Sequence, residues 1–456
     1  MTKLDTAIAA LNPGFSGRLI RPGDADYDTA RTLVYGGFDK RPGLIARVKT
    51  AADVQRAVNA ARDAGLELAV RSGGHSNAGY SSTDGGVVID LRDMAKIEAD
   101  AAGKTLWAET GATAIQVTEA AVDHGLIVGF GDAGSVGVGG ITLGGGVGYL
   151  VRKWGLSIDS LLEAEVVTAD GRLLTASAGE NPELFWALRG GGGNFGVVTR
   201  LKFALHDLPA FTGGMMALPA TPEVLAGFIA AAEAAPEELS TIANVMPAPP
   251  MPFLPAEVHG KMIILAMLAY SGEPEAAQRA LAPFRALATP YADFVKAGPY
   301  TSMYPPEDPH YHPTAAARTM FMDHVGLAEA TTMVRELEAS DAAMRVVQLR
   351  VLGGAFARVT PDATAFAHRQ SKIMVNVAAF WTSPADKLIR EAWIVDMGDK
   401  LQQSDSGAYV NFLAKESPER VRAAYPGPTW DRLRANKATY DPQNLFRLNQ
   451  NIVPAA

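Results

Sequence analysis

The chain of 456 residues contains no cysteine. This absence excludes disulfide bonds, thiolate metal ligands, cysteine nucleophiles and redox-active thiol pairs. Charged residues are also few, at 20% of the chain, and they sum to a net charge of −8 at pH 7. Because nucleic-acid binding needs clustered lysine and arginine to neutralise phosphates, this balance argues against a nucleic-acid partner.

Long uninterrupted apolar runs are missing as well. None reaches the roughly 20 residues that a membrane-spanning helix needs, and the apolar stretch near the N-terminus is broken by Asp5 and Asn12. We therefore expect no membrane association, no secretory leader and a cytoplasmic location. The chain lacks the GxSxG turn of serine hydrolases. His310 and His312 in DPHYHP lack a third ligand nearby, which favours a loop over a metal site.

Length and local pattern predict an α+β protein of two or three domains. Short apolar strands alternate with helices at the start, and one helix is expected over Thr50–Gly65 with Thr50 as its N-cap. The character changes near Leu208, where alanine-rich helices, Pro-rich loops and strand-like runs begin. The end of the chain is again dense in motifs. The predicted parts are 1–208, 209–404 and 405–456.

Glycine is abundant, with 45 residues concentrated in the stretches Gly73–Gly86, Gly129–Gly148 and Gly190–Gly196. Glycine clusters mark backbone that approaches a ligand closely or takes positive φ. In the second stretch, apolar residues interleave the glycines, so a flexible linker does not explain it. In the first, Gly73 and Gly74 precede His75, and their N–H groups suit a pyrophosphate. A tight turn with an exposed histidine is an equal alternative for RSGGH alone.

Two further segments carry chemistry. Gly191, Gly193 and Gly196 fit GxGxxG, but a helix is expected before them and a strand after them. That order is the reverse of a Rossmann site, so we reject NAD. The asparagines and glutamines of Ala408–Leu413 and Tyr440–Pro454 suit the donor–acceptor edge of a heterocycle. Turns and caps explain these residues equally well.

Together these segments resemble the FAD-linked oxidases of the vanillyl-alcohol oxidase type, and most of all the berberine bridge enzyme-like group with its bacterial relatives. The resemblance rests on RSGGH, the VGVGG and LGGG runs, ELFWALRGGGGNFGVVT and the closing Asn-x-Asn-Ile, all in family order. AFAHR and NVAAFW are weaker landmarks in the middle of the chain. The resemblance implies a bipartite FAD-binding domain, built from both chain ends, with an inserted α+β substrate-binding domain.

By this resemblance the cofactor is FAD, and His75 bonds covalently to the flavin C8 methyl group. A neutral imidazole beside a Gly-Gly turn suits a nucleophile. Many relatives add a second link through cysteine, but Ala133 stands at that position, so His75 is the single link. The other residues expected at the cofactor are Arg71, Ser72, Gly73, Gly74, Ser76, Gly79, Tyr80, Gly134, Ser135, Val136, Gly139, Gly140, Gly144, Gly145, Val147, Gly193, Val197, Asn411 and Asn449.

The resemblance also implies hydride transfer from a small organic substrate, an alcohol, sugar or amine, to the flavin, with oxygen as acceptor and hydrogen peroxide as product. Val136 matches a position that gates oxygen, and valine there is typical of an oxygen-reactive enzyme. Asn376 stands where berberine bridge enzymes carry a glutamate base, and it cannot accept the proton.

We expect Tyr409 to be the base or an orienting group, since it shares one face with Asn411 if that segment is extended. Packing beside the ring is the competing interpretation for Tyr409. Three other functions stay open: a dehydrogenase with a different acceptor, a flavin-dependent oxygenase of secondary metabolism, and a non-enzymatic flavin-binding protein. Substrate identity and oligomeric state are not predicted.

Overall fold

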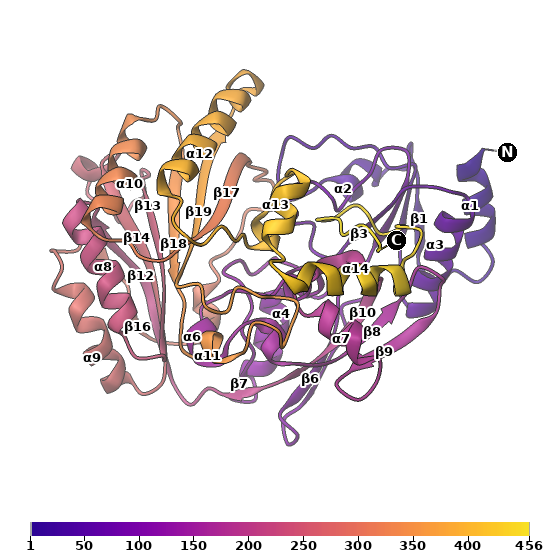
Figure 1. Ribbon diagram of the computed structural model, residues 1–456, viewed down its shortest axis with the longest axis horizontal. Coiled ribbons are helices and arrows are strands. Elements are labelled where there is room, and N and C mark those ends of the chain that lie inside the picture. The colour runs from indigo at the N-terminus through magenta and orange to yellow at the C-terminus, as the bar shows by residue number, and fades with distance from the viewer. Residues whose placement is uncertain (1, 456) are drawn as a thin grey trace.

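The computed structural model describes residues 2–455, which form two lobes around three large sheets (Figure 1). In the first sheet, β2, β4 and β3 are parallel and β1 is antiparallel to β2. The helix α3 connects β2 to β3 and begins after Thr50. Thr50 is its N-cap, as predicted, because the Thr50 side chain accepts a hydrogen bond from Asp53 N. The elements are α1 (Lys3–Leu11), β1 (Arg18–Ile20), α2 (Tyr27–Arg31), β2 (Leu44–Arg47), α3 (Ala51–Asp63), β3 (Leu68–Arg71) and β4 (Val87–Asp90).

The second sheet is antiparallel, with strand order β5-β6-β10-β8-β9. A tight turn at residues 169–171 joins β8 to β9 as a hairpin. The helix α7 precedes the third glycine stretch and β10 follows it, which confirms the order that excluded a Rossmann site. The elements are β5 (Ile97–Asp100), β6 (Thr105–Glu109), α4 (Ala114–Val122), β7 (Leu126–Ile127), α5 (Val138–Leu143), α6 (Val151–Trp154), β8 (Leu161–Val167), β9 (Leu173–Ser177), α7 (Pro182–Leu188), β10 (Val197–Ala204) and β11 (His206–Asp207).

The other lobe is built on an eight-stranded antiparallel sheet of order β15-β12-β14-β13-β18-β19-β17, with β16 beside β12. Four helices cover its outer face, and its inner face turns toward the first lobe (Figure 1). These elements are β12 (Phe211–Pro219), α8 (Pro222–Ala234), β13 (Leu239–Pro247), β14 (Met262–Ser271), α9 (Pro274–Arg285), β15 (Ala292–Asp293), β16 (Lys296–Ala297), β17 (Thr314–Met322), α10 (Leu327–Ala339), β18 (Arg345–Val351), α11 (Ala355–Arg358), β19 (Ile373–Trp381) and α12 (Lys387–Leu401).

Proline and threonine set the start of α8, one of the covering helices. Pro222 occupies the first position of α8 after the N-cap Thr221, whose side chain accepts a hydrogen bond from Val224 N. All of this sheet and its four helices fall between Phe211 and Leu401, inside the predicted insert. The domain limits themselves stay a prediction.

The C-terminal segment returns to the first lobe, where α13 (Pro418–Ala423) and α14 (Pro428–Tyr440) lie beside it (Figure 1). Lys437 on α14 anchors this segment, and its Nζ forms a fully buried ion pair with Asp441 of the same segment at 2.6 Å. Lys437 Nζ also donates to Asn194 O and Phe446 O, each at 2.8 Å. Within residues 2–455 no helix is long and apolar enough to span a membrane.

Candidate functional site

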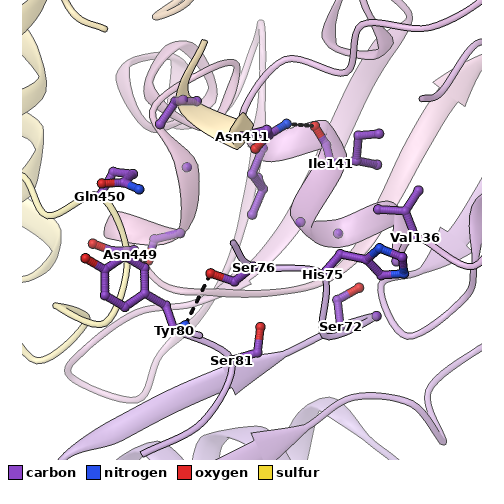
Figure 2. A pocket seen from close by; sticks show the side chains of 18 of the residues that line it. Ser72, His75, Ser76, Tyr80, Ser81, Val136, Ile141, Asn411, Asn449 and Gln450 are labelled. Carbon is purple, nitrogen blue, oxygen red and sulfur yellow. Dashed lines mark hydrogen bonds between the residues drawn. The ribbon is translucent and has the colours of Figure 1, made fainter. Parts of the chain in front are cut away.

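A cavity of about 550 Å³ lies where the glycine-rich stretches, the C-terminal segment and the inner face of the eight-stranded sheet meet. Figure 2 shows His75 and Val136 on one side, Asn449 and Gln450 on the opposite side, and Asn411 between them. Segments far apart in the sequence therefore converge on one space.

Most residues that the sequence predicted for the cofactor line this cavity. They are Ser72, Gly73, Gly74, His75, Ser76, Tyr80, Val136, Gly139, Gly140, Val147, Gly193, Val197, Asn411 and Asn449. The two predicted pocket residues, Asn376 and Tyr409, line it as well. Six predicted residues stand outside the lining: Arg71, Gly79, Gly134, Ser135, Gly144 and Gly145.

Two of these six residues, Arg71 and Gly144, support the cavity lining from behind. The buried Arg71 guanidinium donates to the carbonyl oxygens of Ala30, Arg31 and Ser81, so it braces the turn that carries His75. Gly144 gives the Asn411 carboxamide its space, because a Cβ at this position would lie 2.0 Å from Asn411 Oδ1. Both residues shape the site from behind.

The first two glycine stretches touch through their backbones. A Cβ on Gly137 would lie 2.0 Å from Ser72 Oγ and 2.2 Å from Gly73 N, so this crossing tolerates only glycine. Gly74 has a φ of +80°, a left-handed conformation that glycine adopts at little cost. The close crossing brings His75 and Val136 to one end of the cavity (Figure 2).

His75 is largely removed from solvent. Burial lowers the pKa of its imidazole, against the opposing effect of the Glu307 carboxylate. Its Nε2 lies 2.9 Å from Ser135 Oγ. The ring is therefore neutral at neutral pH, the form in which an imidazole nitrogen is nucleophilic.

Tyr409 lines the cavity and is fully enclosed, with 2% of its surface exposed. Its hydroxyl oxygen accepts hydrogen bonds from Gly146 N at 3.1 Å, Val147 N at 3.2 Å and Asn411 Nδ2 at 2.9 Å. Burial raises the pKa of Tyr409, and the three donors partly oppose that rise. The phenol therefore keeps its proton at neutral pH, and no acceptor for that proton exists among residues 2–455.

The eight-stranded sheet gives the cavity a polar wall formed by Gln348, Arg350 and Asn376. Of these three residues, only Asn376 was predicted from the sequence. Gln348 on β18 and Asn376 on β19 are paired in register. Arg350 is 3% exposed and donates to Val147 O at 3.0 Å, to Asp132 Oδ2 at 2.7 Å and to Gln348 Oε1 at 2.8 Å. Side chains two residues apart on a strand share one face, so the strand-like run around Gln348 and Arg350 could have indicated that both face the same side.

Asp132 and Tyr35 are two further cavity residues without a sequence signal. Among the described residues that line the cavity, Asp132 is the only carboxylate. Tyr35 comes from an irregular N-terminal loop, and burial raises its pKa, with Asp132 and Glu307 adding to the rise. No group of three or more potential metal-ligating acids and histidines occurs in residues 2–455.

Unpaired polar atoms at the cavity test whether FAD fits. Asn449 Oδ1, Gln450 Oε1 and Asn376 Oδ1 are buried acceptors with no hydrogen-bond partner. A buried acceptor without a partner costs free energy, and a ligand rich in O–H and N–H donors would satisfy all three. The glycine crossing, the neutral imidazole and the Asn449 and Gln450 acceptors fit FAD, and Asn376 Oδ1 is left for a second ligand.

Comparisons with known proteins support the same cofactor. The FAD binding domain model matches residues 42–177, and the model described as Berberine and berberine like matches residues 408–453. The chain is 31% identical over 459 residues to (R)-6-hydroxynicotine oxidase of Paenarthrobacter nicotinovorans, covering 96% of this chain and 97% of the relative. It is also 31% identical over 454 residues to an uncharacterized FAD-linked oxidoreductase, YgaK, of Bacillus subtilis (strain 168), covering 96% of this chain and 97% of the relative.

A solved structure has the same architecture. The crystal structure of 6-hydroxy-D-nicotine oxidase from Arthrobacter nicotinovorans matches with a TM-score of 0.85 and 29% identity, covering 97% of this chain and 99% of that one. The match confirms the predicted α+β fold with an FAD-binding part and an inserted substrate-binding part. The chain therefore belongs to the berberine bridge enzyme-like family of FAD-linked oxidoreductases, and it is an FAD-dependent oxidoreductase.

Proposed function

We propose that the protein oxidises a small organic molecule at FAD bonded covalently through His75 alone, and that molecular oxygen receives the electrons as hydrogen peroxide. The observation that carries the proposal is one continuous cavity with a neutral imidazole at one end and a polar wall on its sheet side. The absence of cysteine leaves no thiol for a second link.

FAD, when bound, supplies the hydride acceptor that no side chain can supply. Residues of this chain bind and orient it. Asn449 and Gln450 offer their unpaired carboxamide oxygens to its donors. Asn411 is fixed for the same purpose, since its Nδ2 donates to Ile141 O at 2.9 Å and to Tyr409 (Figure 2).

Removal of a hydride from an alcohol or amine carbon also requires a proton acceptor. Asp132 fills that role in the proposal, because it is the cavity's carboxylate and Arg350 engages only its Oδ2. Asn376 Oδ1 accepts a hydrogen bond from the substrate. The raised pKa of Tyr409 favours the orienting role for this residue over that of the resting base, with its proton donated into the cavity.

An anaerobic substrate screen that follows flavin absorbance tests the proposal. Hydroxylated heterocyclic amines lead the screen because one relative is named for 6-hydroxynicotine, and alcohols and sugars follow. We expect a substrate to bleach the flavin without oxygen, and air to restore the colour with one peroxide per turnover. Recovery only with another electron acceptor would indicate a dehydrogenase. Incorporation of oxygen-18 from O₂ into the product would indicate an oxygenase.

A further inference from the structure

A chain of two groups from two separate segments, Ser135 and Glu307, reaches His75 from outside the cavity. Ser135 Oγ lies 2.9 Å from His75 Nε2, and the same hydroxyl donates a short hydrogen bond to a carboxylate oxygen of Glu307. The backbone N–H of Ser135 donates to the other oxygen of Glu307 at 3.2 Å. Glu307 therefore holds Ser135 by two contacts, and Ser135 faces the imidazole.

The chemistry of these groups determines the direction of the hydrogen bonds. An ionised carboxylate only accepts, and a serine hydroxyl has a single proton. Because the Ser135 proton points to Glu307, Ser135 Oγ accepts the second hydrogen bond, and the His75 nitrogen facing it carries a proton. His75 is thereby held as the tautomer with hydrogen on Nε2 and the lone pair on Nδ1. Within residues 2–455, Nδ1 has no hydrogen-bond partner.

Glu307 is brought to this position by the Pro-rich loop that contains DPHYHP. The loop lies between Met303 and β17, in the inserted lobe, and it is fastened to the N-terminal part of the chain. Gly36 N donates to Pro313 O at 2.9 Å, and His312 Nδ1 lies 3.2 Å from Val34 O. The histidine-containing loop thus places a carboxylate behind the attachment residue.

We propose that Ser135 and Glu307 are positioning residues for the covalent attachment of FAD. They hold His75 with Nδ1 free as the nucleophile, and they receive the Nε2 proton as positive charge develops on the imidazole. This inference rests on the proposed covalent link and extends it by naming the residues that make His75 reactive.

Attachment replaces one C–H bond of the flavin methyl group by a C–N bond to His75. Nδ1 forms a bond to the methyl carbon at flavin C8, and one C–H bond of that methyl group breaks. The C–H electron pair stays on the isoalloxazine ring as a two-electron reduction, the C–H proton leaves, and the Nε2 proton passes through Ser135 to Glu307. Molecular oxygen then takes two electrons and two protons as hydrogen peroxide. The net result is the loss of one methyl hydrogen and one imidazole hydrogen and the formation of one C–N bond.

Attachment kinetics test the role of this chain of groups. Full-length protein from riboflavin-starved cells is mixed with FAD in air, and acid-stable flavin per chain is followed over time beside the equilibrium affinity for FAD. We expect Ser135→Ala and Glu307→Gln to slow attachment by ~10²–10⁴, as for the loss of a proton-transfer group, with FAD affinity nearly unchanged. Ser135→Thr keeps a hydroxyl and should restore the rate. Asp308→Asn removes the neighbouring charge and should match the wild type.

Two results would overturn the inference while leaving the covalent link intact. One is attachment at the wild-type rate in both Ser135→Ala and Glu307→Gln. The other is a flavin peptide bonded through Nε2, identified by NMR. Absence of acid-stable flavin in the wild type would overturn the proposed link and this inference together. Glu307 lies on an exposed loop, so Glu307→Gln tests the inference without changing the glycine-rich stretches that line the cavity.

Discussion

Replacing Tyr409 by phenylalanine removes one oxygen atom and keeps the ring. The ring packs edge-on against Phe366 and Phe412, with centroids 6.1 and 5.1 Å away, and these contacts persist in the variant. The lost oxygen is the acceptor for two backbone N–H groups and one amide N–H group in a buried place. The change therefore isolates a hydrogen-bonding site.

The structure indicates the size of both effects. Three lost hydrogen bonds at about 1 kcal/mol each lower the free energy of unfolding by about 3 kcal/mol. Loss of a donor that orients the reacting groups slows flavin reduction by ~10²–10³. Urea unfolding followed by tryptophan fluorescence measures the first effect, and anaerobic stopped-flow reduction by a substrate measures the second.

Tyr425→Phe is the matched control for stability. Tyr425 is equally buried and also lines the cavity, but its hydroxyl has no hydrogen-bond partner among the described residues, so its removal breaks none in the FAD-free protein. We expect FAD-free Tyr425→Phe to be as stable as the FAD-free wild type, and Tyr409→Phe is compared in the same FAD-free form. If Tyr409→Phe matches the wild type in both stability and reduction rate, the account of its hydroxyl is refuted.

Three further substitutions test other parts of the account. Val136→Leu should slow reoxidation of the reduced flavin by oxygen while leaving its reduction by substrate unchanged, and an unchanged reoxidation rate counts against oxygen gating. Asp132→Asn keeps the shape but removes the proton acceptor beside Arg350, so flavin reduction should slow by ~10²–10⁴, and wild-type reduction would exclude Asp132 as the base. Lys437→Met leaves Asp441 buried without its cation, which should cost ~3–5 kcal/mol in urea unfolding, and a loss below about 1 kcal/mol would show that the pair contributes little.

The sequence was informative where function depends on backbone. Backbone that runs close to a ligand or to another segment requires glycine, as at the crossing of Gly73 and Gly137. This requirement is visible in the local sequence. Helix caps such as Thr50 are equally local. Through the family resemblance that the glycine-rich stretches carry, the fold, the cofactor class and 16 of the 42 residues that line the cavity could be predicted.

Pairs of groups that meet only through tertiary structure were missed, although Ser135 itself was expected at the cofactor. Asp132 and Arg350 are 218 positions apart, and Ser135 and Glu307 are 172 positions apart, so no spacing rule connects them. A sequence motif also does not show whether a side chain faces the cavity or points away from it. Arg71 is an example, since it was expected at the cofactor but braces the turn from behind the cavity lining.

Acid precipitation tests the central claim, a single covalent link from His75 to FAD, most directly. We predict that the wild-type pellet stays yellow and that the intact mass of the chain is increased by one FAD. We predict that the His75→Ala pellet is colourless, although the native variant still binds FAD reversibly. Flavin released from the wild type into the acid supernatant, or flavin retained in the His75→Ala pellet, would contradict the account.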